Sequence, residues 1–243
     1  MSIHLIGGGW DAGAAESVYG GFLAEAGSSP QIACVVLDEG EGQQQFERWA
    51  TAISGVADCR PVPVLVPEGG RLDISALGDA DGLLVCGGWT PAYADALAPV
   101  AADLQAWLAA GRPYAGFSAG AAIAAERAIV GGWHDGSVQV CPEESGEDLD
   151  QVTVVDGLGL LPLSVDVHAA QWGTLPRLIA AISNRGLAAG VALDENTAIV
   201  VDGREATVRG IGAAHLARRD GKNVLVRTLT AGTTFDTLAV SGG

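Results

Sequence analysis

The sequence has no apolar run that approaches the length of a bilayer span, although 49% of its 243 residues are hydrophobic. It opens directly into the strand-like residues 2–6, without a basic and apolar leader. Basic residues are also scarce, because 13 Lys and Arg face 29 Asp and Glu, for a formal net charge of −16. This imbalance argues against nucleic acid and against a membrane as partners. We therefore expect a cytoplasmic protein.

Closely spaced cysteines are also absent. The four cysteines at positions 34, 59, 86 and 141 lie far apart and form no Cys-x-x-Cys pair. Such spacing indicates neither a zinc site nor a disulfide framework. Cys34 and Cys86 fall in strand-like runs, where a buried, inert thiol is the natural interpretation. We expect no metal and no organic cofactor.

The alternation of strand and helix signals predicts an α/β fold. Apolar runs typical of buried parallel strands occur at residues 2–6, 31–37, 61–66, 82–86 and 113–116. Helical patterns lie between them, at residues 16–26, 43–53 and 91–110. This order is that of a doubly wound, mostly parallel sheet flanked by helices, and the length favours one domain. Its functional site belongs at the carboxyl ends of the strands.

A nucleophile elbow follows the fifth predicted strand. The sequence Gly116-Phe117-Ser118-Ala119-Gly120 has glycines two positions to either side of a serine, before an alanine-rich helical pattern. In such an elbow the serine occupies a tight strand-to-helix turn, and larger residues at the glycine positions would collide with neighbouring elements. The same pattern also occurs as a simple packing turn. As a catalytic element it makes Ser118 the nucleophile.

Two other glycine-rich loops fall at the same edge of the predicted sheet. The amides of Gly88 and Ala119 are the candidates for an oxyanion hole, since this hole combines the residue after the nucleophile with a neighbouring loop. A plain strand-to-helix turn explains Gly87-Gly88 equally well. The loop at residues 7–9 lacks the G-x-G-x-x-G spacing of dinucleotide-binding proteins, and only Asp38 could serve as the acidic partner.

The base that Ser118 requires has few candidates, because the chain has only four histidines. His4 lies within the first strand and His215 in a late strand-like segment, which leaves His134 and His168. His168 ends a strand-like run at residues 163–168 and precedes a helical pattern at residues 175–184. This position puts it at the same sheet edge as Ser118, although many histidines at strand ends are only structural.

Four segments together carry a resemblance to a known family. These are the Gly-Gly-Trp-Thr segment from Gly87, the elbow with Ile129-Val130-Gly131-Gly132 after it, Asp166-Val167-His168, and residues 190–198. The order resembles that of the cyanophycinase and dipeptidase E family of serine peptidases, over most of the chain. The resemblance implies a single domain over residues 1–243 with a class I glutamine amidotransferase-like, flavodoxin-like fold. Residues 201–204 and 219–222 are also similar to the hairpin turns at the end of cyanophycinases.

The resemblance also implies roles for individual residues. Ser118 corresponds to the nucleophile, His168 to the general base, and Asp135 best matches the acid that orients the histidine. Glu126 and Asp166 are alternatives for that acid. Such a triad cleaves an amide bond through an acyl-enzyme, with the histidine moving the proton.

Specificity is where the sequence departs from this family. Cyanophycinases carry an acidic residue and a glutamine after the Gly-Gly pair and several arginines after the histidine, which suit β-linked aspartyl-arginine substrates. In this sequence, Trp89 and Thr90 follow the Gly-Gly pair. The segment after His168 contains Trp172 and keeps only one arginine, Arg177. These four residues are the candidates for substrate binding. The sequence therefore favours a small peptide or amide other than cyanophycin as the substrate, and it leaves aspartyl dipeptides open.

The acidic segment at residues 143–150 lies between the elbow and the His168 strand. It is a solvated loop or, alternatively, a lid that selects positively charged substrates. Two other functions remain open: a serine hydrolase or acyl transferase that does not act on peptides, and a non-catalytic binding protein with a relic elbow. A homodimer is compatible with the sequence, which does not fix the oligomeric state.

Overall fold

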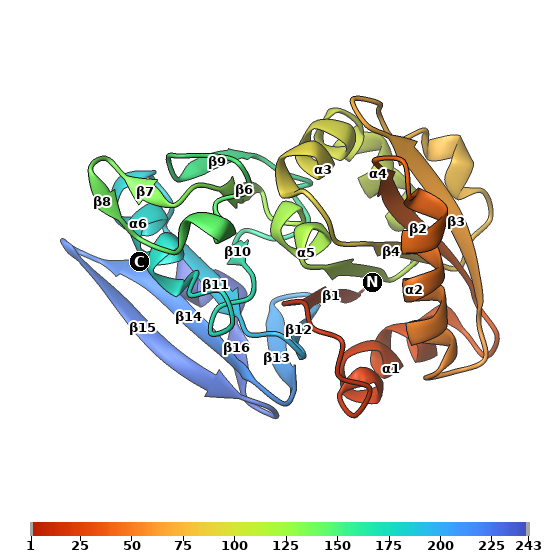
Figure 1. Ribbon diagram of the computed structural model, residues 1–243. Coiled ribbons are helices and arrows are strands. Elements are labelled where there is room, and N and C mark those ends of the chain that lie inside the picture. Colours follow the sequence, from red (N-terminus) through yellow and green to blue (C-terminus); the bar gives the residue numbers. More distant parts are fainter. Residues whose placement is uncertain (1, 242–243) are drawn as a thin grey trace.

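The large sheet of the molecule has five parallel strands, followed at one end by three antiparallel strands (Figure 1). The computed structural model describes residues 2–241. Eight strands lie in the order β16-β13-β12-β1-β5-β4-β2-β3. The five strands from β1 to β3 in this order are parallel to one another, and they are β1 (Ser2–Ile6), β5 (Tyr114–Phe117), β4 (Gly82–Val85), β2 (Gln31–Asp38) and β3 (Arg60–Pro67). These five strands confirm the predicted parallel sheet, and every strand end lies within one residue of its predicted position.

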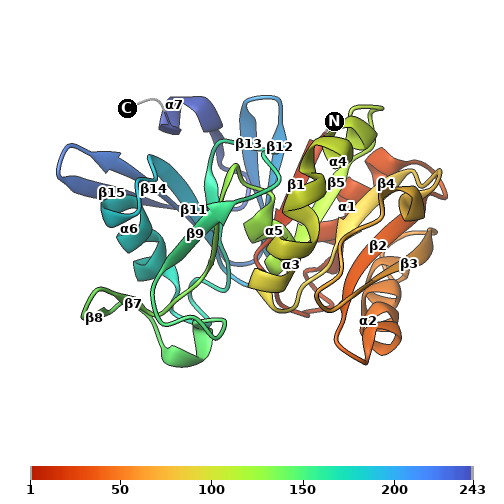
Figure 2. The ribbon, with the colours of Figure 1, turned by 90° about the horizontal axis from the view of Figure 1, so that it is seen from above.

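Helices cover both faces of this sheet, as Figure 2 shows. Alternation of side chains along β1 sends Ile3 and Leu5 to one face and Ile6 to the other. One face packs on α1 (Ala15–Ala26) and α2 (Gly42–Ser54). The other face packs on helices from the middle of the chain, namely α3 (Thr90–Leu97), α4 (Ala101–Leu108) and α5 (Ala119–Ile123). Burial on both faces explains why these strands are almost continuously apolar.

The helical pattern at residues 91–110 forms two helices rather than one. The α-helix stops at Leu97, and the 3-10 turn η2 (Ala98–Val100) leads into α4. Pro99 lies in this turn, where its ring and its missing N–H disfavour a continuous helix. Another 3-10 turn, η1 (Ile74–Leu77), connects β3 to β4.

The second half of the chain builds a smaller sheet beside the first (Figure 1). Its strand order is β10-β11-β14-β15, with β10 parallel to β11. The strands are β10 (Ser164–Asp166), β11 (Ala189–Leu193), β14 (Ala213–Asp220) and β15 (Asn223–Thr230). Helix α6 (Leu175–Asn184) packs on this sheet and coincides with the predicted helix. One continuous apolar core, with Leu5 of β1 and Val191 of β11, joins the two sheets.

The remaining short elements connect or extend the two sheets. Hairpins at residues 202–205 and 220–223 confirm the predicted β-turns of the C-terminal part. The elements not yet named are β6 (Arg127–Gly131), β7 (His134–Asp135), β8 (Val138–Gln139), η3 (Glu143–Ser145), β9 (Thr153–Asp156), β12 (Thr197–Asp202), β13 (Glu205–Gly210), β16 (Thr234–Asp236) and α7 (Thr237–Ser241). In residues 2–241, no helix combines the length and the apolar character that a membrane span requires.

Candidate active site

Ser118 lies on the sharp turn between β5 and α5. Its φ of 52° and ψ of −109° are a strained conformation for a residue with a side chain. The turn is possible because both flanking glycines are in close contact with backbone. A Cβ at Gly116 would collide with the carbonyl of Gly120, and a Cβ at Gly120 would collide with the carbonyl of Val85. The geometry is therefore that of the predicted elbow.

A chain of hydrogen bonds runs from Ser118 through His168 to Glu195. Ser118 Oγ lies 2.8 Å from His168 Nε2, and His168 Nδ1 lies 2.8 Å from Glu195 Oε1. Ser118 and His168 are buried, whereas the Glu195 side chain is 26% exposed. Since a carboxylate only accepts, Nδ1 carries the proton and Nε2 is free to accept from the serine hydroxyl. This is the proton arrangement that general-base activation of a serine requires.

His168 follows β10 and is held there by backbone from two other strands, β1 and β11. Its amide donates to Gly7 O after β1, and the next amide, of Ala169, donates to Leu193 O of β11. Gly8 lies so close that a Cβ there would collide with the imidazole ring. The glycine-rich loop at residues 7–9 thus makes room for the histidine. This packing accounts for the glycines without any bound nucleotide.

Glu195 is held by the loop that follows β11. Its amide donates to Oε1 of Gln171, which belongs to the turn after His168. The preceding residue, Asp194, accepts hydrogen bonds from the amides of Ala170 and Ala213. The same carboxylate lies 3.3 Å from Nε2 of His215. The loop that carries Glu195 and the turn after His168 are therefore hydrogen-bonded to each other.

Unusual backbone conformations are concentrated in this region. Among the described residues other than glycine, five have a positive φ: Ser118, Glu147, Asp148, His168 and Asn196. Ser118 and His168 belong to the hydrogen-bonded chain, and Asn196 follows Glu195. The two acidic residues lie on the rim of the cleft described below. Strain of this kind persists where surrounding structure enforces it, and it gathers at functional sites.

Burial and Glu195 act on the pKa of His168 in opposite directions. Burial is the larger effect and lowers the pKa of His168 below its ordinary value of 6.5, while the hydrogen bond and charge of Glu195 raise it. The result is a lowered pKa, so the imidazole is neutral at pH 7. A neutral imidazole is the form that can accept the proton of Ser118.

Asp135, the predicted partner of His168, lies elsewhere. It belongs to the β7–β8 hairpin, pairs with Arg185 at 2.9 Å, and accepts a hydrogen bond from Asn184 at the end of α6. The predicted alternatives do not reach the histidine either. Glu126 is exposed after the elbow helix, and Asp166 pairs with Arg177. Glu195 takes the position that these residues were expected to fill.

Sequence reasoning missed Glu195 even though it lies in the segment 190–198 that carries the family resemblance. The available signal was its place just after a strand, as for His168. Only the parallel pairing of β10 with β11, with Asp166 beside Ala192, brings the two strand ends together. Such pairing cannot be deduced from the spacing of residues in the chain.

Two amides expected to form an oxyanion hole lie next to Ser118. The loop of Gly88 packs on the elbow so closely that a Cβ at Gly87 would be 3.1 Å from Cβ of Ser118. Ala119 is the first residue of α5. Within residues 2–241, neither the Gly88 nor the Ala119 amide donates to another protein group. Gly88 is exposed and lines the cleft, whereas Ala119 is fully buried behind Ser118.

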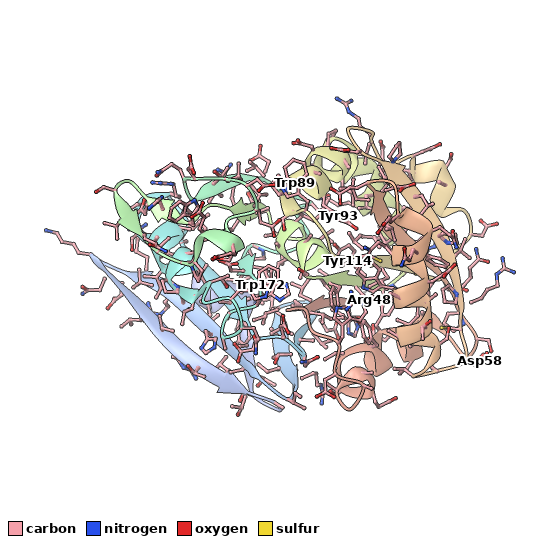
Figure 3. All side chains as sticks on the ribbon, in the orientation of Figure 1. Arg48, Asp58, Trp89, Tyr93, Tyr114 and Trp172 are labelled. Atoms are coloured by element: carbon pink, nitrogen blue, oxygen red, sulfur yellow. The ribbon has the colours of Figure 1, made fainter. Side chains whose placement is uncertain are left out.

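The hydrogen-bonded chain opens into a cleft of about 1110 Å³. Trp89 and Trp172, two of the predicted substrate-binding residues, line it together with Arg48, and Figure 3 labels all three. Acidic side chains dominate its polar lining: Glu39, Glu68, Glu143, Glu144, Glu147 and Asp148. Of the described residues that line the cleft, Arg48 is the only lysine or arginine, and its guanidinium lies 3.8 Å from the centre of the Trp10 ring.

The other two predicted substrate-binding residues are buried in structural contacts. The hydroxyl and amide of Thr90 donate to the carboxylate of Glu147 at 3.1 Å each. Arg177 is 4% exposed and forms two hydrogen bonds with Asp166, of 2.9 and 2.7 Å, while a third goes to Ser145 O. Thr90 and Arg177 thus hold the acidic segment at residues 143–150 against the body of the protein.

This acidic segment is part of the cleft rather than a detached loop. Its carboxylates line the cleft together with Ser118, and Trp89 Nε1 donates to the carbonyl of Glu147. Burial raises the pKa of Glu147 above its ordinary value, although the hydrogen bonds from Thr90 oppose this effect. The rim is thereby anchored by a partly buried carboxyl group.

The described residues contain no group of three or more His, Cys, Asp or Glu side chains arranged to hold a metal ion. Cys34 and Cys86 are buried, as predicted, and burial raises the pKa of the Cys34 thiol to about 12. The cleft is lined by Ser118, His168 and several carboxylates, which are groups that can take part in proton transfer and nucleophilic attack. Together with the doubly wound sheet, they define a serine-type hydrolase on an α/β scaffold.

Comparison with known proteins narrows this class to one family. The model for Peptidase family S51 matches residues 67–209, which is more than half of the chain. The protein belongs to this family and is a serine-type peptidase. The match confirms the resemblance to the dipeptidase E and cyanophycinase group.

Two solved structures share the fold. A peptidase from an acI-B1 actinobacterium superimposes with a TM-score of 0.69 at 18% identity, over 97% of this chain and 96% of the other. A protein from Listeria monocytogenes EGD-e assigned as a peptidase E gives a TM-score of 0.52 at 16% identity, over 94% and 98%. No curated protein sequence shows significant similarity to the chain.

Proposed function

We propose that the protein hydrolyses an amide bond of a small peptide through an acyl-enzyme on Ser118. The observation that carries this proposal is the hydrogen-bonded chain from Ser118 through His168 to Glu195. Residues from both sheets form this chain, so the proposed catalytic unit is the whole chain, residues 1–243.

In the first half of the reaction, Ser118 Oγ attacks the carbonyl carbon while His168 Nε2 accepts its proton. The carbon–nitrogen bond then breaks, and the imidazolium gives the proton to the leaving amine. Water next attacks the acyl-enzyme by the same proton route and releases the acid. Glu195 replaces Asp135 as the proposed acid that fixes the tautomer and stabilises the imidazolium.

The amides of Gly88 and Ala119 are the proposed donors to the oxyanion. Both belong to segments that pack around the elbow, and neither has a protein acceptor within the described chain. One such donor contributes about 3 kcal/mol to transition-state stabilisation in serine hydrolases. Preorganised donors avoid the reorganisation that water would require.

The cleft favours a substrate with positive charge close to the scissile bond. Five of its six carboxylates are exposed, and none of these five has a basic partner among the described residues. The single arginine of the lining, Arg48, is stacked on Trp10. Arg177, the residue expected to bind a substrate carboxylate, is already paired with Asp166. Electrostatic attraction therefore selects lysine, arginine or a free amino group rather than aspartate.

Active-site labelling tests the catalytic part of this proposal. A fluorophosphonate should modify the native protein once, at Ser118, as read by intact mass and peptide mapping. The Ser118→Ala and His168→Gln variants should not react, whereas His134→Gln should react normally because His134 lies outside the cleft. A folded native protein that does not react would instead support a non-catalytic binding protein.

A matched substrate series tests the charge preference. Dipeptides with arginine, lysine, norleucine, glutamate or aspartate at the N-terminal position should be cleaved in that falling order of kcat/KM. The advantage of arginine over norleucine should shrink as salt rises from 20 to 500 mM, because exposed charges are screened (about 8 Å Debye length at 0.15 M). A preference for aspartate would refute the cationic substrate but leave the acyl-enzyme intact.

A further inference from the structure

One aromatic side chain of the cleft lies directly on the imidazole of His168. The rings of His168 and Trp172 are stacked, with 3.9 Å between their centres and 10° between their planes. The histidine is 6% exposed, whereas Trp172 is 42% exposed. The indole is therefore a cover between the buried imidazole and solvent.

The backbone fixes this stack. The amide of Trp172 donates to the carbonyl of His168 at 2.8 Å. The same turn is closed at its base by Thr174, whose hydroxyl donates to Val167 O at 2.6 Å. His168 itself has a φ of 55°, which turns the chain sharply enough to return over its own side chain. The contact is thus part of a closed turn.

The same turn supports the carboxylate partner. Gln171 precedes Trp172 and accepts the hydrogen bond from the Glu195 amide at 2.8 Å. Gln171 and Trp172, which are adjacent in one turn, therefore contact Glu195 and the His168 ring respectively. Ser118 and Glu195 fix the imidazole at its two nitrogens, and Trp172 fixes the orientation of the ring plane.

We propose that Trp172 is a positioning residue that holds the His168 ring in line between Ser118 and Glu195 and stabilises its cationic form during catalysis. The negative face of an indole attracts a cation that stacks on it. The imidazole becomes cationic when it takes the proton of Ser118, so the stack is stronger in the transition state than in the resting enzyme. The catalytic half of this inference depends on the proposed function.

The test must separate the indole face from simple shielding. Trp172→Leu keeps an apolar cover but removes the aromatic face, and Trp172→Phe keeps an aromatic face of smaller size. The charged groups that act on the imidazole, namely Glu195, Asp166 and Arg177, are unchanged in both variants. Trp107→Leu is the matched control, because Trp107 lies on α4 and bonds to Gly78 O, away from the cleft.

The first measurement needs no substrate. The chain has four histidines, so their Cε1 proton resonances can be followed by NMR, with the signal of His168 identified by its loss in His168→Gln. In the native protein, ring current should shift this signal upfield. In Trp172→Leu, the upfield shift should disappear and the pKa of His168 should fall, since the imidazolium loses its aromatic partner. Trp172→Phe and Trp107→Leu should stay close to the native protein.

The second measurement follows the chemistry at Ser118. The saturating rate of fluorophosphonate labelling should fall about tenfold in Trp172→Leu, which is the size expected for a lost cation–π contact. Trp172→Phe should recover most of this rate. The half-saturating concentration of the reagent should change little, because the indole acts through the histidine.

Two results would overturn the inference. One is a native NMR spectrum in which the His168 signal has neither the upfield shift nor any response to Trp172→Leu. The other is a Trp172→Leu variant with a native labelling rate and an altered half-saturation alone, which would make the indole a substrate contact. A native stack in a protein that never labels would instead refute the proposed function while leaving the positioning of the ring in place.

Discussion

Two pairs of ionisable side chains at one end of the small sheet differ in what they can do. Asp166 and His168 are two residues apart, and each is hydrogen-bonded to an ionisable partner, Arg177 and Glu195 respectively. The side chains of Asp166 and Arg177 alone are 2% and 5% exposed, and two parallel hydrogen bonds join them. The side chains of His168 and Glu195 alone are 8% and 26% exposed, and one hydrogen bond joins them.

The difference lies in how the two pairs respond to a proton. Burial alone would lower the pKa of Arg177, but the charge and hydrogen bonds of Asp166 raise it, so the guanidinium stays charged. His168 is neutral at rest and can gain and lose a proton next to Glu195. The first pair therefore fixes structure, and the second can take part in a reaction. Four predictions test this contrast, in order of falling effect.

Removal of the Glu195 charge should have the largest effect. Glu195→Gln should slow Ser118 labelling by about 10³-fold, because an amide can stabilise the wrong imidazole tautomer and cannot balance the imidazolium charge. The matched variant Asp135→Asn should retain a labelling rate within about threefold of the native one. The reverse result would return the role of the third residue to Asp135.

Removal of the Arg177 charge should act on stability. Arg177→Met leaves Asp166 buried without its partner, which should lower the free energy of unfolding by about 3–5 kcal/mol. The same substitution at Arg127, whose pair with Asp156 is 48% and 86% exposed, should cost less than about 1 kcal/mol. Urea unfolding followed by circular dichroism measures both. Equal losses of unfolding free energy in the two variants would show that the buried pair contributes no more to stability than the exposed one.

The pH dependence should distinguish the two pairs without a mutation. His168 must be neutral to act as base, and burial lowers its pKa below 6.5. The labelling rate should therefore fall as the pH is lowered, and more than half of it should remain at pH 6.5. The fit of the rate against pH should give a midpoint below 6.5. A midpoint above 6.5 would mean that Glu195 outweighs burial.

Loss of the Thr90 hydroxyl should have the smallest effect. Thr90→Val keeps the shape of the side chain but removes one of its two hydrogen bonds to Glu147. The expected cost is about 1 kcal/mol, felt at the acidic rim. Amide hydrogen exchange should become faster at residues 143–150, while the amides of β10 and β11 keep their native protection. Faster exchange throughout the protein would mean that the rim is not a separate unit.

Much of the fold could be predicted because its signals are local. The strand runs at residues 2–6 and 31–37, the helix at residues 175–184 and the two C-terminal hairpins depend on nearby residues, and the structure contains them all. The helical pattern at residues 91–110 is broken at Pro99, and the hydrophobic periodicity of the segment alone does not predict this break. The elbow was equally visible, because its glycine spacing is local, although Gly120 is also required by its contact with the carbonyl of Val85 in the neighbouring strand β4.

The parallel sheet, the elbow and the excess of negative charge could be predicted from periodicity, glycine spacing and composition, because these signals need no distant partner. The acid that meets His168 depends on the packing of the folded chain, because β10 and β11 must pair before Glu195 can reach the histidine. This packing also decided that Arg177 pairs with Asp166 and that Trp172 covers the imidazole. A long side chain can reach partners in several directions, so its partner is set by the packing of distant segments and not by its position in the chain.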